Sequence, residues 1–194
     1  MIIKLRYLLI IPILALLSVA VFNNKCHQIE VIQEPPEFSQ KLSWASFDNA
    51  EILAERVGKV FNKIPSEEIR LIVNSAIKHE SKEGEFPSRY DILAVIAVES
   101  GFNCKARNGK DSGCMQINRG HWPSFPEEAF WDIDENIRYG AYLLETYFQK
   151  NNGDTNVALK IYNSGETAVR NNREKPGYSE KFNRYKNELF YSEM

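Results

Sequence analysis

An unbroken run of apolar residues over 92–98, ending in a glutamate, Glu99, restricts the fold of this chain more than any other feature. Ser88 and Asp91 are helix-starting residues directly before the run, so the sequence predicts a helix that extends to Ser100. A helix that is apolar on every side must be covered on every side, which predicts that it lies at the centre of the domain.

Glu99 would then lie at the buried C-terminal end of this helix. Burial and the negative end of the helix dipole both disfavour a charged carboxylate, so we expect a raised pKa for Glu99. A carboxyl group that stays protonated near neutral pH can serve as a general acid. The alternative is that Ser100 and Gly101 end the helix at the surface and that Glu99 extends into water.

The rest of the domain also has the spacing of helices. Asp48 and Ser66 are expected as N-caps of the first two, and sustained period-two alternation is absent from the sequence. The sequence therefore predicts an all-α domain. Its other helices are expected at 48–61, from Ser66 to a turn at 84–87, and at 134–149, 155–163 and 178–190.

Residues 1–22 form a separate apolar segment. Lys4 and Arg6 precede an almost continuous apolar run, an order typical of an export signal. The small residues at 18–20 resemble a cleavage site, whereas the length of the run is close to the roughly 20 residues of a membrane span. A cleaved signal peptide and a membrane anchor both stay open, and either predicts an exported protein in the periplasm or cell envelope, in the second case anchored to the inner membrane.

Residues 23–45 contain two adjacent prolines and are predicted to be an extended linker, so the helical domain is expected to span 46–194. Two of the 24 basic residues lie in the apolar segment, so the remainder is more acidic than the net charge of −2 of the whole chain. This balance argues against nucleic-acid binding. The basic clusters at 170–175 and 184–186 are interpreted as solvated helix faces.

Cysteine and histidine residues are few. Cys104 and Cys114 lie in one short region and could form a disulfide in an oxidising compartment, or could be two small buried residues. Cys26 is left over in either case. The three histidines are scattered and no C-x-x-C motif is present, so we expect neither a metal site nor a cofactor.

Four sequence blocks, at 99–103, 113–118, 136–143 and 158–165, occur in the order of one family. They read Glu-Ser-Gly-Phe-Asn, Gly-Cys-Met-Gln-Ile-Asn, Asn-Ile-Arg-Tyr-Gly-Ala-Tyr-Leu and Ala-Leu-Lys-Ile-Tyr-Asn-Ser-Gly. Over about 69–185 the chain resembles the soluble lytic transglycosylase domain, which has a lysozyme-like fold. The resemblance implies cleavage of the β-1,4 bond between N-acetylmuramic acid and N-acetylglucosamine in peptidoglycan, without water, to give 1,6-anhydro ends.

The resemblance also implies roles for individual residues. Glu99 would act alone, first as acid and then as base. Met115 and Gln116 would offer apolar and polar contacts to sugar, Gly113 would let the backbone come close, and Tyr162 would approach the catalytic carboxyl. Outside the family pattern, Tyr162 would be interpreted as a core aromatic and Asn163 as a helix cap. The implied substrate-binding residues are Ser100, Gly113, Met115, Gln116, Tyr162 and Asn163, and Asn136 and Gly140 are expected to be architectural.

Segment 108–118, with His121 and Trp122 behind it, looks closer to small transglycosylases that accompany secretion, conjugation or phage assemblies. Such an assembly is a candidate partner, beside the glycan strands themselves. Two alternative functions stay open. A hydrolytic lysozyme on the same fold would need a second acid such as Asp111, which we otherwise interpret as a loop residue. An inactive envelope assembly module would keep the fold alone.

Overall fold

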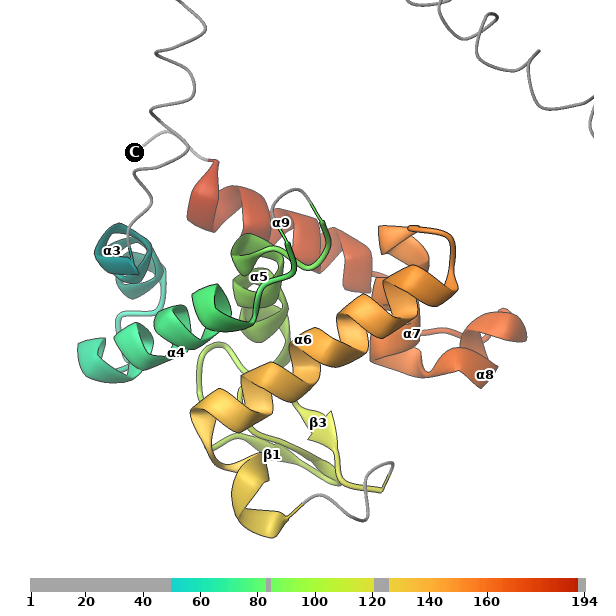
Figure 1. Cartoon of the computed structure of the whole chain (residues 1–194), viewed down its shortest axis with the longest axis horizontal. Helices are drawn as coiled ribbons and strands as arrows, with labels where there is room; N and C mark the ends of the chain where they lie inside the picture. The colour runs from blue at the N-terminus through green and yellow to red at the C-terminus, as the bar shows by residue number, and fades with distance from the viewer. Residues whose placement is uncertain (1–49, 83–84, 121–125, 192–194) are drawn as a thin grey trace, which may run out of the picture. The chain divides into compact units, whose positions relative to one another are not determined.

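The structure is a computed structural model that describes residues 50–82, 85–120 and 126–191. The predicted apolar segment, the linker and Asp48 lie outside the described residues. Within the described ranges the chain is mostly helical, as the sequence predicts, with three two-residue strands (Figure 1). The elements are α3 (Ala50–Val60), α4 (Ser66–His79), α5 (Arg89–Glu99), β1 (Arg107–Asn108), β2 (Asp111–Ser112), β3 (Ile117–Asn118), η1 (Glu127–Phe130), α6 (Ile133–Lys150), α7 (Thr155–Ser164), α8 (Glu166–Arg170) and α9 (Tyr178–Phe190).

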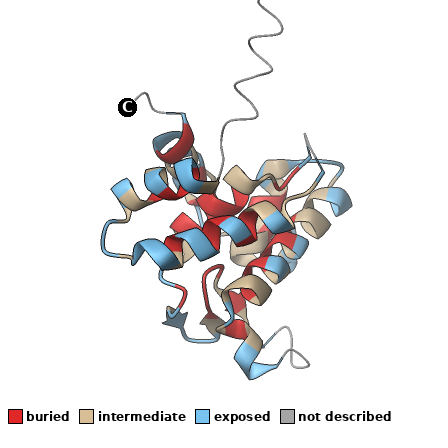
Figure 2. Ribbon diagram, turned by 60° about the vertical axis from the view of Figure 1, so that its left-hand side comes forward, coloured by how far each residue is buried: buried red, intermediate tan, exposed pale blue. Residues whose placement is uncertain are grey.

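Helix α5 is the centre of the domain, which confirms the prediction from its apolar sequence. The Ser88 side chain accepts a hydrogen bond from the backbone of Asp91, and the Asp91 carboxylate accepts one from the backbone of Ser88. This capping box starts the helix. The residues from Asp91 to Ala97 are buried, and α5 packs against α4, α6 and α9. Buried residues lie on the inner sides of the helices and exposed residues on their outer sides (Figure 2).

The start of α4 differs from the sequence prediction. Ser66 is the first residue of the helix and Pro65 is its N-cap, with no side-chain capping bond. The Pro65 carbonyl already accepts the backbone hydrogen bond of Ile69, so Ser66 is inside the first turn. Proline suits this place because its φ is fixed and it has no N–H to satisfy.

The segment around Asp111, interpreted from sequence as a loop, is a small antiparallel sheet in the order β1-β2-β3. Arg107 pairs with Ser112, and Ser112 pairs with Ile117 on its other side. Strands of two residues are too short to show period-two alternation, which is why the pattern did not predict them. The sheet lies beyond the C-terminal end of α5, next to the start of α6 (Figure 1).

The C-terminal half of the domain consists of α6 to α9. Helix α6 begins one residue earlier than predicted because Asp132 caps it, and Asp154 caps α7 in the same way. Helix α9 has the predicted bounds and packs against α3, α5 and α7. No helix within the described residues is both long enough and apolar enough to cross a membrane.

Candidate active site

Glu99 is the last residue of α5, and one of its carboxylate oxygens, Oε1, accepts a hydrogen bond of 2.6 Å from the hydroxyl of Tyr178. Burial raises the pKa of Glu99 to about 7, and the nearby Asp111 carboxylate adds to the rise. The Tyr178 hydrogen bond and the Lys175 ammonium act in the opposite direction. The carboxyl group is therefore divided between its acid and carboxylate forms near neutral pH.

Tyr178 is the first residue of α9, and Gly177, with φ of 83°, caps the helix before it. Burial and the negative charge of Glu99 raise the pKa of Tyr178 well above its ordinary value, so its hydroxyl stays protonated and can donate. Tyr178 was not predicted from the sequence as a site residue. The one available signal was an aromatic residue directly after Pro176-Gly177, at the predicted start of the last helix.

Tyr162, expected to approach the catalytic carboxyl, lies within the electrostatic reach of Glu99. Burial raises its pKa well above the ordinary value, and the charge of Glu99 contributes. Its hydroxyl, however, donates to the backbone carbonyl of Met115 at 2.8 Å. Tyr162 thus holds the backbone beside the site, and the hydrogen bond to Glu99 comes from Tyr178.

The Met115 side chain is fully buried, so it does not form the apolar wall of a groove that the resemblance implies. Its sulfur occupies space that only a glycine leaves free. A Cβ at Gly140 would lie 2.3 Å from Met115 Sδ. Gly140 is therefore architectural, as expected, and the buried Met115 carbonyl is the acceptor for Tyr162.

Gln116 and Gly113 shape the turn between β2 and β3. Gln116, with φ of 49°, donates from Nε2 to the carbonyls of Ala106 and Gly113 at 3.0 and 2.9 Å. A Cβ at Gly113 would lie 2.2 Å from Asn136 Nδ2. The group that comes close to Gly113 is thus the Asn136 side chain of the protein itself. Of the two Gln116 hydrogen bonds, the one to Gly113 closes the turn and the one to Ala106 ties the turn to the residue before β1.

Ser100 and a disulfide bind this turn to the end of α5. The Ser100 hydroxyl donates to the carbonyl of Cys114 at 2.7 Å. Cys104 and Cys114 are joined by a disulfide with their Cα atoms 4.0 Å apart. The backbone that follows Glu99 is therefore fixed against the turn that carries the Met115 carbonyl.

Asn163 lies at the end of α7 and donates from Nδ2 to the Ser164 hydroxyl at 3.1 Å. Ser164 Oγ also accepts the backbone N–H of Lys175 at 2.9 Å. These contacts connect the end of α7 to the segment before α9. In the structure Asn163 thus supports the position of Lys175, whose charge acts on Glu99.

Asp111 is the second carboxylate whose charge reaches Glu99. It lies in β2 and accepts a hydrogen bond from Asn118 Nδ2 of β3 at 2.7 Å. Within the described ranges there is no group of three or more His, Cys, Asp and Glu residues that could hold a metal ion.

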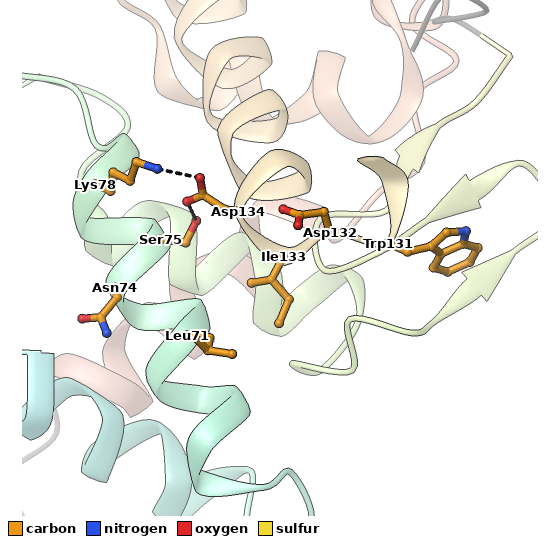
Figure 3. A pocket seen from close by; sticks show the side chains of 8 residues that line it. All are labelled: Leu71, Asn74, Ser75, Lys78, Trp131, Asp132, Ile133 and Asp134. Atoms are coloured by element: carbon orange, nitrogen blue, oxygen red, sulfur yellow. Dashed lines mark hydrogen bonds and ion pairs between the residues drawn. The ribbon is translucent and has the colours of Figure 1, made fainter. Parts of the chain in front are cut away.

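A separate cavity of about 490 Å³ lies between α4 and the start of α6 (Figure 3). At one end Asp134 Oδ2 accepts from Lys78 Nζ at 2.7 Å and Asp134 Oδ1 accepts from the Ser75 hydroxyl at 2.9 Å. Leu71, Ile133 and Trp131 form the apolar part, and the Trp131 indole points away from the Asp134 end (Figure 3). Neither Glu99 nor Tyr178 is among its lining residues.

A buried carboxyl at the end of a central helix, faced by a small antiparallel sheet within an otherwise helical domain, defines the lysozyme-like class. The sequence model of the transglycosylase SLT domain family matches residues 75–185, a range that contains Glu99, Tyr162 and Tyr178. The chain therefore belongs to the transglycosylase SLT domain family, whose members cleave glycosidic bonds in peptidoglycan. No solved structure matches the chain.

Proposed function

We propose that this protein is a peptidoglycan lytic transglycosylase in which Glu99 is the single acid and base. The observation that carries the proposal is the state of Glu99: a half-buried carboxyl with a pKa raised to about 7, hydrogen-bonded by Tyr178 at 2.6 Å. A group that must give up a proton and then take one works best when its pKa is near the working pH.

In the first step the protonated Glu99 carboxyl donates its proton to the glycosidic oxygen. The bond from that oxygen to C1 of the muramoyl residue breaks, and N-acetylglucosamine leaves with a free 4-hydroxyl. In the second step the Glu99 carboxylate removes the proton of the muramoyl 6-hydroxyl, whose oxygen bonds to C1 and closes a 1,6-anhydro ring. Glu99 ends protonated, as it began, and no water is consumed.

The Tyr178 hydroxyl has a defined place in this cycle. It stabilises the carboxylate between the two steps, because a donated hydrogen bond favours the charged form. The Met115 carbonyl that accepts from Tyr162 is buried, so this contact fixes the turn between β2 and β3 and is not offered to the sugar.

A hydrolytic muramidase is the second candidate, and one observation favours it: the charge of Asp111 reaches Glu99. Retaining and inverting glycosidases use two carboxyl groups, one of which binds the sugar or activates water. We prefer the lyase because Asp111 is already engaged by Asn118 within the sheet.

Mass spectrometry of products from purified peptidoglycan separates the two reactions. We expect muropeptides that end in 1,6-anhydro-N-acetylmuramic acid, and products heavier by one water would establish the hydrolase instead. Glu99→Gln should reduce product formation by roughly a hundredfold or more, since general acid–base catalysis contributes that much. A wild-type protein that releases no more product than Glu99→Gln, both at the rate of a buffer control, would leave only the inactive assembly module.

We also propose that the protein acts outside the cytoplasm, at the cell wall, and that it opens the wall locally for a secretion, conjugation or phage assembly. The export proposal rests on residues 1–22 and is supported by the disulfide between Cys104 and Cys114, a bond that persists in oxidising compartments. Cell fractionation of the full chain, with a variant that lacks residues 1–22 as control, tests the location. Deletion in a strain that carries such an assembly tests the partner.

A further inference from the structure

A polar pocket of about 560 Å³ adjoins the candidate active site. It lies between α7 and the start of α9, and Lys160, Lys175 and Tyr178 are among its lining residues. Tyr178 belongs to both places, since it lines the pocket and its hydroxyl donates to Glu99. A group that enters the pocket is thus one side chain away from the catalytic carboxyl.

The charges on the pocket are unevenly compensated. Lys160 forms an ion pair of 3.0 Å with Glu174, so these two charges balance. Lys175 is exposed and forms no ion pair within the described residues. Its charge reaches the reacting group, because it lowers the pKa of Glu99. Lys175 is therefore the cation available to an incoming anion, and Glu180, also exposed, is the lining carboxylate that an ammonium group could approach.

The substrate of the proposed function carries a matching group. Each muramoyl residue has a lactyl substituent at C3 from which a stem peptide branches, away from the line of the glycan strand. Stem peptides present carboxylates and amides. A pocket beside the cleavage site, lined by Lys175 and by the amide side chains of Asn156 and Asn172, offers partners for both.

We propose that this pocket binds the stem peptide of the muramoyl residue, with the Lys175 ammonium on a peptide carboxylate. The proposal rests on the proposed function, which supplies the substrate. It also gives a role to the basic segment 170–175, which the sequence analysis interpreted as a solvated face. In this proposal the glycan strand lies at Glu99 and the pocket binds the peptide that branches from it.

The test compares two substrates with one set of variants. The substrates are peptide-bearing glycan strands and strands whose stem peptides an amidase has removed, which still carry the lactyl carboxylate. We expect Lys175→Ala to lower the ratio of kcat/KM for peptide-bearing over denuded strands by about three- to fivefold, as befits one partly solvated ion pair. Lys175→Arg keeps the charge and should keep most of the ratio.

Lys181→Ala is the matched control, because Lys181 is an exposed lysine of α9 that does not line the pocket. It should leave the ratio unchanged. Taking a ratio removes any effect of Lys175 on the pKa of Glu99, since both substrates use the same acid. An unchanged ratio in Lys175→Ala would overturn the proposal, and so would an equal loss in Lys181→Ala.

A binding measurement keeps the proposal testable apart from catalysis. N-acetylmuramoyl-L-alanyl-D-glutamate and N-acetylmuramic acid are titrated into the Glu99→Gln protein and followed by NMR. We expect the peptide-bearing ligand to bind more tightly, and Lys175→Ala to remove that advantage. If wild type yields no anhydro ends but the peptide-bearing ligand still binds more tightly, the proposed reaction is wrong and the proposal of stem-peptide binding in the pocket is supported. Equal affinity for the two ligands would refute the proposal that the pocket binds the stem peptide.

Discussion

At the scale of single residues, Glu99 is controlled by opposing influences. Burial raises its pKa to about 7 and the Tyr178 hydrogen bond limits that rise. Burial alone would keep the Glu99 carboxyl protonated at neutral pH. The hydrogen bond from the Tyr178 hydroxyl stabilises the carboxylate form, so that both forms are populated. In the proposed reaction, the same pair would set the protonation of Glu99 at rest and stabilise the carboxylate that acts in the second step.

Tyr178→Phe removes a hydrogen bond that favours the carboxylate, so the pKa of Glu99 should rise. The alkaline limb of the pH profile of kcat/KM, where the acid form is lost, should therefore move to higher pH, and the maximal rate should fall. A pH–rate series measures both. Tyr191→Phe is the control, because Tyr191 is 63% exposed at the end of α9. A limb that stays in place or moves to lower pH would contradict this account.

Glu99 also makes folding stability depend on pH. Its pKa is raised from 4.5 to about 7 in the folded protein, so its carboxyl is most favourable below pH 4.5 and loses that contribution as pH rises through 7. The full loss is about 3 kcal/mol. Glu99→Gln carries no charge, so its stability relative to wild type should increase between pH 4.5 and pH 8. Urea unfolding at both values measures this, with Glu188→Gln, on the exposed side of α9, as control.

Glu99 could be identified from the sequence because the apolar run before it predicts a buried helix that ends at this residue. It could not identify Tyr178, whose contact with Glu99 spans 79 positions and leaves no local pattern. The burial of Met115 was hidden for the same reason. Only the folded chain shows that the sulfur fills the space left by Gly140.

At the scale of elements, α6 supports the turn between β2 and β3 through two residues one helical turn apart. Asn136 Oδ1 accepts the backbone N–H of Met115 at 2.8 Å, and Asn136 Nδ2 donates to the carbonyls of Ser112 and Phe130. Gly140 receives the Met115 side chain. The position of the turn that is bonded to Ser100 is therefore set by a helix that contributes no group to the candidate site.

Gly140→Ala should disturb this support. The added Cβ would lie 2.3 Å from Met115 Sδ, so either the side chain or the turn must move, at a cost of about 1–3 kcal/mol. Activity should fall as well, because the turn that is bonded to Ser100, next to Glu99, and to Tyr162 would move. Gly58→Ala is the matched control: a Cβ there meets only Ile69 Cδ1 at 3.7 Å, and a helical alanine should stabilise by about 0.5–1 kcal/mol. Equal effects of the two changes on thermal unfolding would contradict this packing.

Sequence predicted the longer helices well, since each buries a stripe at helical spacing. The two-residue strands, η1 and α8 were not predicted. Elements of this length contain too few residues for a period, and their hydrogen bonds depend on neighbours brought in by the fold.

At the scale of the whole domain, α9, at the end of the described residues, packs against the central helix α5. Lys186 Nζ contacts Asp91 Oδ1 at 2.6 Å, and the Asp91 side chain is 8% exposed. Arg56 of α3 donates to the carbonyl of Phe190 at 3.1 Å. These contacts cover α5 and bring Tyr178 to Glu99.

Lys186→Ala should leave the Asp91 carboxylate buried without this countercharge. We expect a loss of about 2–3 kcal/mol in the free energy of unfolding, slightly below the range for fully buried pairs because Lys186 is 25% exposed. Lys59→Ala, which removes an exposed contact with Glu55, should cost less than about 1 kcal/mol. Denaturant unfolding of the two variants measures both losses. A Lys186→Ala loss no larger than that of Lys59→Ala would refute the role of Lys186 as the countercharge of Asp91.

The place of Tyr178 in the chain has a consequence for biosynthesis. Glu99 leaves the ribosome long before the residue that binds it, and an unfinished chain lacks both that hydroxyl and the helix that covers α5. A chain cut short before α9 would therefore keep Glu99 without its hydrogen-bond donor and without the helix that packs most closely on α5. The candidate site is therefore assembled only once α9 has joined the fold.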